Sequence, residues 1–180
     1  AMCSVFFIDE SQRVTTSDIG SVEEIEKWAL YEGAEVSYME LISQFRCNGS
    51  DGYLAWLDNI LEIRETANYD IKDIDYDIRI CDTPNEVRDI VVEKNSSPNH
   101  ARLLAGYCWN WLKEGKNNSN VHDIRIGDFE MSWNLGNTST YAIDDESINE
   151  VGCIHTSQGL EFDYVGVIIG PSVKYRDGRI

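Results

Sequence analysis

The sequence predicts an α/β fold in which a mainly parallel sheet is covered by helices. Short apolar runs that end in polar residues, such as residues 4–8, are typical of buried parallel strands. Amphipathic helical patterns alternate with these runs at the spacing of βα units. A run rich in β-branched residues, residues 164–169, is closed by Gly170-Pro171 and indicates a further buried strand.

The composition is that of a globular protein. A chain of 180 residues is long enough for one domain with a hydrophobic core, or for a domain and a piece of another. Apolar residues make up 42% of the chain and aromatic residues 11%, which argues against wholesale disorder. The sequence has no apolar run as long as a membrane span, so we expect a soluble protein without a membrane partner.

The five cysteines are dispersed along the chain, without a C-x-x-C pair or a histidine at metal-binding spacing. They are Cys3, Cys47, Cys81, Cys108 and Cys153. An odd, dispersed set in mostly apolar surroundings is typical of reduced core thiols. We therefore predict a cytoplasmic location.

The formal net charge is −17 and the isoelectric point is near 4.4. Binding to nucleic-acid phosphates requires clustered Lys and Arg, and the sequence contains no basic stripe. We therefore expect nucleic-acid binding by this chain alone to be weak or absent. The acidic charge favours a protein partner.

The first third of the chain predicts strand, helix and strand in that order. Residues 4–8 are expected to form a buried strand whose carboxyl end brings Asp9 and Glu10 to the rim of the sheet. A helix is expected to begin at residue 17 or 18 and to end at residue 32, because its apolar residues recur at helical spacing. Residues 35–41 alternate as a strand does.

The middle of the chain continues this alternation. The predicted elements are a helix over 53–63, a strand over 77–81, a helix beginning at Pro84 and a strand over 101–105. They are followed by an aromatic cluster (Tyr107, Trp109, Trp111), a polar surface loop (113–120) and a β-extension (124–133).

Residues 152–170 predict a strand, a polar loop built on Thr-Ser-Gln-Gly, and a second buried strand. Ligands in parallel sheets bind at loops that follow the carboxyl ends of strands, and Gly159 lets the backbone approach a ligand closely. Further on, Asp177-Gly178 indicates a hairpin. The sequence stops within this hairpin, as expected of a truncated fragment.

Asp9 and Glu10 are the first candidates for catalysis. A hydrolytic nucleotide site needs one carboxylate to hold Mg²⁺ and another to orient or deprotonate the attacking water. Adjacent carboxylates at the end of a parallel strand can divide these two tasks. The alternative is an acidic turn after a core strand, which is the commoner reason for an isolated Asp-Glu pair.

Two further segments carry candidate binding residues. Arg46 follows a predicted strand, where a guanidinium can neutralise a transferring phosphoryl group, and the neighbouring Phe45 can stack on a base. Gly159 and Glu161 can contact phosphate and ribose, and Thr156 can contact a nucleic-acid phosphate. The alternatives are a solvated or salt-bridged arginine in the first segment and a polar turn between two core strands in the second.

A phosphate-binding loop is missing from the sequence. The pattern G-x-x-x-x-G-K-[ST] does not occur, because Gly115-Lys116 is followed by Asn117 and lacks the earlier glycine. We therefore expect the nucleotide site on this chain to be incomplete.

Three segments, taken in order, resemble motifs II, IV and V of superfamily 1 helicases, and in particular the Schlafen group-3-like DNA/RNA helicase domain family. The segments are Phe7-Ile8-Asp9-Glu10-Ser11-Gln12-Arg13, Ser43-Gln44-Phe45-Arg46-Cys47 and His155-Thr156-Ser157-Gln158-Gly159-Leu160-Glu161-Phe162-Asp163. The resemblance runs along nearly the whole chain. It implies a RecA-like fold of the P-loop NTPase type.

The resemblance also implies roles for the residues of motifs II and IV. Asp9 matches the Mg²⁺ carboxylate of the Walker B motif, and Glu10 matches the general base. Gln12 matches the glutamine that couples nucleotide state to the rest of the site. Arg46 matches the arginine on the γ-phosphate, and Phe45 the aromatic residue near the base.

In motif V, Gly159 and Glu161 match nucleotide contacts and Thr156 matches a nucleic-acid contact. By this resemblance, residues 1–35 are a remnant of a first RecA-like domain. Residues 36–180 are then the second RecA-like domain, truncated at its C-terminus. Walker A, a clear motif III and the motif VI arginine are absent from the sequence.

The implied function is that of a fragment of an ATP-dependent superfamily 1 helicase-like protein, which does not hydrolyse ATP unaided. ATP, Mg²⁺ and DNA or RNA are implied for the complete protein, and no tightly bound cofactor is expected on this chain. The expected partners are the missing first RecA-like domain and a second copy through self-association. The alternative is a non-catalytic RecA-like interaction or binding module.

Overall fold

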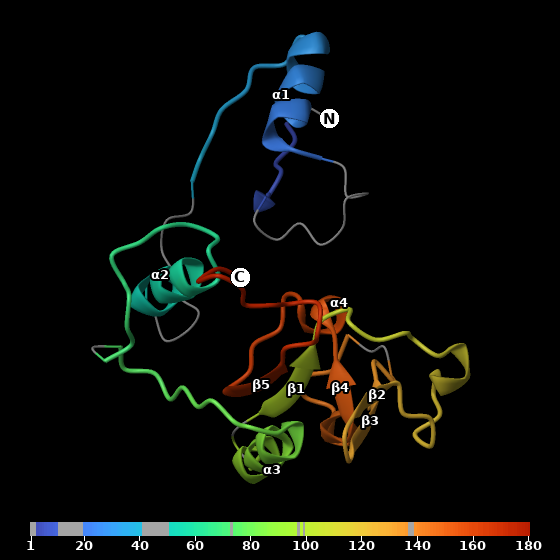
Figure 1. The fold of residues 1–180 in the computed structure, drawn as a ribbon. Coiled ribbons are helices and arrows are strands. Elements are labelled where there is room, and N and C mark those ends of the chain that lie inside the picture. Colours follow the sequence, from blue (N-terminus) through green and yellow to red (C-terminus); the bar gives the residue numbers. More distant parts are fainter. Residues whose placement is uncertain are drawn as a thin grey trace. The chain divides into compact units, whose positions relative to one another are not determined.

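The computed structural model describes residues 3–10, 20–40, 51–72, 74–96, 98, 100–136 and 139–180. The chain divides into two compact units, Ala1–Ser43 and Gln44–Ile180 (Figure 1). The assignment of residues 1–35 to a first RecA-like domain and of residues 36–180 to a second stays a prediction.

The first unit contains the predicted helix, α1 (Val22–Tyr31), which begins at Val22 and not at residue 17 or 18 as predicted. Its N-cap is Ser21, whose Oγ accepts a hydrogen bond from the Glu24 amide at 3.1 Å. Gly33 follows the helix with a φ of +73°. The helix carries no fully buried side chain, and Trp28 is 59% exposed.

The predicted strand over residues 4–8 is wrong for this structure. Residues 3–9 are not in a strand, and Phe7 is 84% exposed. A strand needs a neighbour for its N–H and C=O groups, and the described residues of this unit include no strand. The predicted strand over 35–41 is wrong in its described part, residues 35–40, for the same reason.

The second unit contains a five-stranded sheet in the order β2-β3-β4-β1-β5 (Figure 1). The strands are β1 (Ala101–Ala105), β2 (Ile124–Ile126), β3 (Phe129–Trp133), β4 (Glu150–Gly152) and β5 (Tyr164–Ile168). β1 is parallel to β4 and β5, and β3 is parallel to β4, whereas β2 is antiparallel to β3. The predicted α/β fold with a mainly parallel sheet is confirmed, as a RecA-like fold requires.

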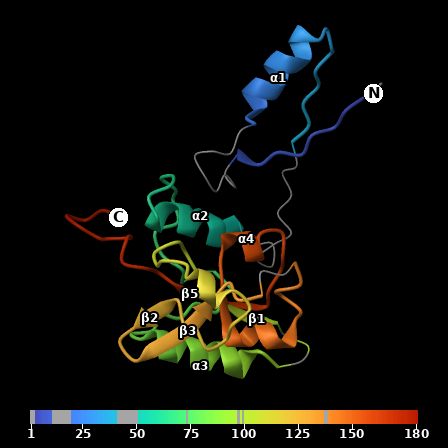
Figure 2. The same ribbon diagram turned by 90° about the vertical axis from the view of Figure 1, so that its right-hand side faces the viewer.

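One face of this sheet is covered by α3 (Pro84–Lys94), which contacts β1 and β5 (Figure 2). Pro84 begins the helix as predicted, and Thr83 caps it. Leu103 lies opposite Val151 on one side and Gly166 on the other. The hydrophobic core lies on this face and comprises Val91, Ala101, Leu103, Ala105, Ile124, Phe129, Met131, Trp133, Val151, Cys153 and Ile168.

Residues 139–149 lie against the other face of the sheet. They include the 3₁₀ helix η4 (Asp145–Asn149), which contacts β1 and β4. The Tyr141 hydroxyl donates a hydrogen bond to the Leu103 carbonyl at 2.7 Å. Gly152 lies beneath the Tyr141 ring, where a Cβ would be 2.7 Å from ring carbons, so a larger residue does not fit.

The remaining elements lie before and between the strands. α2 (Asp51–Ile60) corresponds to the helix predicted over 53–63, and the 3₁₀ helix η3 (Lys113–Gly115) lies in the predicted surface loop. The strand predicted over 77–81 is wrong, because these residues form no strand and Ile80 is 97% exposed. The predicted hairpin at Asp177-Gly178 is confirmed by a bridge between Arg176 and Arg179.

Candidate functional site

The candidate site lies at the carboxyl edge of the sheet. β1, β3, β4 and β5 run in the same direction, so the segments that follow them meet at one edge. This edge is the usual place of ligand sites in parallel sheets. The segments are 106–108, 134–136, 153–157 and 169–171.

After β4 the chain forms one helical turn, α4 (Ile154–Ser157), where the sequence predicted a polar loop. The Cys153 amide donates to Thr156 Oγ1 at 2.7 Å, and Thr156 Oγ1 donates to the Cys153 carbonyl at 3.0 Å. Thr156 is only 6% exposed. Its hydroxyl therefore caps the turn in this structure, and its nucleic-acid role stays a prediction.

Gly159 and Glu161 lie further along the same connection, and both are exposed. Gly159 has a φ of +81°, in the left-handed region that favours glycine. Among the described residues, no atom lies within 4 Å of the place where its Cβ would be. The space beside the Gly159 backbone is therefore open, and its role as a nucleotide contact stays a prediction. The connection is tied to the sheet by Asp163, whose Oδ2 accepts from the His100 amide at 2.7 Å.

Tyr107 follows β1 and reaches the α4 turn. Its hydroxyl donates to Cys153 Sγ at 3.5 Å, and its ring makes edge contacts with Trp133 and His155 at centroid distances of 4.9 and 5.9 Å. Burial, with a smaller contribution from the hydrogen bond to Cys153, raises the pKa of Tyr107 to about 12. The sequence singled out Tyr107 only as a member of an aromatic cluster and did not predict its contact with His155.

A buried arginine supports the other face of the sheet. Arg102 is 1% exposed, and desolvation lowers the pKa of its guanidinium. Its donors reach the Tyr141 carbonyl (3.1 Å), Ser147 Oγ (2.5 Å), Asn95 Oδ1 (2.6 Å) and the Asp144 carbonyl (2.8 Å). It thereby fixes residues 141–147 against β1. Sequence reasoning missed this role, because the residues it contacts lie up to 45 positions away.

Glu150, at the start of β4, is a buried carboxylate. Its Oε2 accepts a hydrogen bond from the Gly136 amide at 3.1 Å. Burial raises the pKa of Glu150, hydrogen bonds from the Gly136 and Leu135 amides oppose this, and the charge of Asp144 adds to the rise. Glu150 therefore holds the segment after β3 against the sheet, a role that no sequence pattern indicated.

Asp9 and Glu10, the predicted Walker B carboxylates, lie in the first unit. Both are exposed, and neither follows a strand. Glu10 Oε1 accepts a hydrogen bond from the Val22 amide at the start of α1, at 2.9 Å. Gln12, Phe45 and Arg46 lie outside the described residues. Of the predicted site residues, Thr156, Gly159 and Glu161 thus occupy one connection in the second unit.

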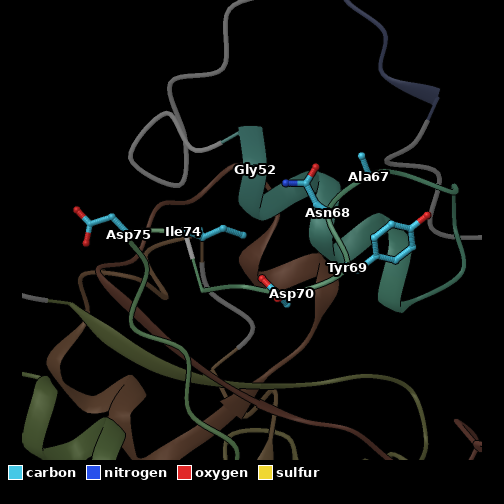
Figure 3. Close-up of a pocket in the computed structure, with 7 residues that line it drawn as sticks. All are labelled: Gly52, Ala67, Asn68, Tyr69, Asp70, Ile74 and Asp75. Carbon is cyan, nitrogen blue, oxygen red and sulfur yellow. The ribbon is translucent and has the colours of Figure 1, made fainter.

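A separate hollow of about 440 Å³ lies between α2 and the segment that follows it (Figure 3). It is lined by Gly52, Ala67, Asn68, Tyr69, Asp70, Ile74 and Asp75. Two carboxylates and no cationic side chain line it, so it does not suit a phosphate. Lys72 lowers the pKa of Asp70 through hydrogen bonds from its backbone amide and its side chain.

The described residues offer some of the groups that ATP would need, but not a site for Mg²⁺. Gly159 and Glu161 offer an open backbone and a carboxylate at the carboxyl edge. However, the described residues contain no group of three His, Cys, Asp or Glu side chains arranged to hold a metal ion. We therefore derive no catalytic step from this chain alone. No helix in the described ranges is long and apolar enough to cross a membrane.

Comparison with known proteins gives two matches. The sequence profile of the Schlafen group 3, DNA/RNA helicase domain matches residues 1–180. "Uncharacterized protein YPL245W" of Saccharomyces cerevisiae is 26% identical over 151 residues, which cover 75% of this chain and 32% of the yeast protein. The chain thus spans about a third of the length of this relative. No solved structure matches the chain.

Proposed function

The chain belongs to the Schlafen group 3 DNA/RNA helicase domain family, and we propose that it is part of an ATP-dependent, helicase-like protein. The observation that carries this proposal is the family match over all 180 residues, together with three helicase-like motifs in the expected order. We further propose that this chain does not hydrolyse ATP unaided, because its sequence lacks the phosphate-binding loop.

The proposed roles of the motif II residues follow from their chemistry. Asp9 would hold Mg²⁺, and Glu10 would take a proton from the attacking water. Gln12 would couple the nucleotide state to the rest of the protein. Asp9 and Glu10 are both exposed residues in this structure, and we propose that a partner domain supplies the phosphate cradle.

The remaining roles concern the nucleotide and the nucleic acid. Arg46 would neutralise charge on the γ-phosphate, and Phe45 would stack near the base. Gly159 and Glu161 would contact the nucleotide through the backbone and a carboxylate. The open, left-handed backbone at Gly159 supports its role, because a side chain would be strained there.

ATP binding and hydrolysis test this proposal directly. This chain is compared with a form extended at both ends, and each is also made with Glu10→Gln. We expect turnover only in the extended form, and we expect Glu10→Gln to abolish it, because the amide cannot accept a proton. An extended form that neither binds nor hydrolyses ATP would refute the proposal.

A non-catalytic interaction module is the second candidate function. The net charge of −17 favours it, because it disfavours contact with phosphate groups and suits a protein partner. Exposed apolar side chains on the edge strand β5, Val165 and Val167, also favour a partner or self-association. This candidate replaces the first if the extended form lacks nucleotide binding and turnover.

A further inference from the structure

Tyr107 combines high exposure with a fixed position. It is 57% exposed at the carboxyl end of β1, a strand with neighbours on both sides. Its hydroxyl is hydrogen-bonded to Cys153 Sγ at 3.5 Å, and its ring is held by edge contacts with Trp133 and His155. The hydroxyl end of Tyr107 is turned toward Cys153, whereas the residue as a whole stays more than half exposed.

A ring that is already fixed loses little conformational freedom when a ligand stacks on it. The three contacts therefore prepare Tyr107 for binding. Like any tyrosine with a pKa at or above the ordinary value of about 10, Tyr107 is neutral at physiological pH, so its phenol does not repel a phosphate. His155, which touches the ring, lies on the α4 turn, where the sequence resembles motif V.

The loop after Tyr107 differs in character from the rest of this acidic chain. Trp111 is 49% exposed, and the lysines Lys113 and Lys116 are exposed close behind it, with Glu114 as the only acidic residue among positions 107–116. The loop is anchored to the sheet, because the Leu112 amide donates to Asp123 Oδ1 at 2.7 Å. Exposed aromatics next to lysines are the combination that binds single-stranded nucleic acid.

We propose that Tyr107 and His155 form a stacking platform for a base of single-stranded nucleic acid, with Trp111 as a second stacking residue and Lys113 and Lys116 as phosphate contacts. This inference rests on the proposed helicase-like function and assigns its nucleic-acid contact to specific side chains. Stacking supplies most of the affinity, because the loop offers only two cations. Each stacked base is worth a factor of roughly ten or more in affinity.

The test is binding of fluorescently labelled oligothymidylate and oligouridylate to the full 180-residue chain, followed by fluorescence anisotropy at low salt. We expect Tyr107→Ala to weaken binding roughly tenfold or more and Tyr107→Phe to preserve it, because the phenylalanine ring still stacks. Tyr175→Ala is the matched control, since Tyr175 is 75% exposed in the C-terminal tail and should not affect binding. Thermal unfolding of each variant checks that it is folded.

Salt dependence provides a second readout. With two phosphate contacts, the logarithm of the binding constant should fall with the logarithm of salt concentration with a slope of about −1.4. A much steeper slope would overturn the proposal, because phosphate contacts elsewhere would then dominate. Double-stranded DNA should compete poorly, because its bases are already stacked.

The remaining outcomes separate this inference from the proposed function. If the chain binds the oligonucleotides and Tyr107→Ala binds equally well, the platform is refuted while nucleic-acid binding stands. If the chain does not bind them at all, the platform is also refuted, and ATP turnover by the extended form still decides the proposed function. Loss of binding in Tyr107→Ala but not in Tyr107→Phe or Tyr175→Ala supports the platform.

Discussion

Arg102 is a buried, charged residue whose role in this structure is to hold a loop in place. Its hydrogen-bond acceptors are carbonyl, hydroxyl and carboxamide oxygens, and no carboxylate among the described residues forms an ion pair with it. The sequence correctly predicted a buried strand over 101–105 but gave no reason for a cation in it. The reason is the planar guanidinium, which can reach several acceptors of one loop at once.

We expect Arg102→Lys to destabilise the protein by about 2–4 kcal/mol, because a lysine cannot reproduce the fork of donors and leaves buried acceptors without partners. Urea unfolding followed by tryptophan fluorescence measures this change. The control is Arg88→Lys on the exposed side of α3, which should change the unfolding free energy by less than about 0.5 kcal/mol. Equal effects of the two substitutions would show that the buried network is not stabilising.

Glu150 makes stability depend on pH. Because burial raises its pKa above the unfolded value, the native state favours the protonated carboxyl. The stability it contributes is therefore fully present below the unfolded pKa and is lost as pH rises through the folded pKa. We expect Glu150→Gln, compared with the unmodified chain, to gain relative stability as the pH rises above about 4.5, the ordinary pKa of the carboxyl.

Unfolding free energies of both proteins over this pH range measure the effect, and Glu146→Gln, at an exposed position in η4, is the control. A constant difference between Glu150→Gln and the unmodified chain across the range would contradict the raised pKa. If Glu150→Gln instead lost stability relative to the unmodified chain at high pH, the pKa of Glu150 would be lowered and not raised.

At the scale of elements, the sequence predicted the helices and the strands that pair in the sheet better than the segments that pair with no strand. α1 and α3 carry their own signals, a capping side chain and an apolar face, and β1 and β5 are apolar runs with parallel neighbours. Residues 4–8 and 77–81 have the same local pattern as strands. They lack a pairing partner among the described residues, and the local periodicity of a sequence does not indicate whether a neighbouring strand exists.

The contact between α3 and β5 requires a glycine. A Cβ at Gly166 would lie 2.6 Å from Val87 Cγ1 and 2.7 Å from Val91 Cγ2, so the helix could not stay in place. We expect Gly166→Ala to destabilise the protein by about 1–3 kcal/mol through overpacking. Thermal unfolding measures this. Gly106→Ala, where no described atom lies within 4 Å of the new Cβ, should be close to neutral, and an equal loss there would argue against a packing cause.

At the scale of the whole molecule, the candidate site combines residues of one contiguous motif with residues that are far apart in the sequence. Sequence reasoning located the connection after β4, because Gly159 and its neighbours form a contiguous motif. It did not predict that Tyr107 meets His155, because the two are 48 positions apart and only the parallel pairing of β1 with β4 brings them together. Nor did it predict that Arg102 and Tyr141, 39 positions apart, meet on the other face of the sheet.

The distribution of buried side chains predicts which part of the chain carries its stability. Every buried side chain among the described residues lies between Val91 and Ile168, in the second unit. Helix α1 in the first unit has ten residues and no fully buried side chain, and so short a helix is marginal on its own.

We therefore expect a chain of residues 44–180 to unfold cooperatively, with a thermal midpoint within a few degrees of that of residues 1–180. Circular dichroism at 222 nm measures both transitions, and a peptide of residues 1–43 should be largely non-helical. If residues 44–180 lose the cooperative transition, the first unit must contribute core packing to the second. If the midpoint holds, the first unit, which contains Asp9 and Glu10, contributes little to the stability of the second.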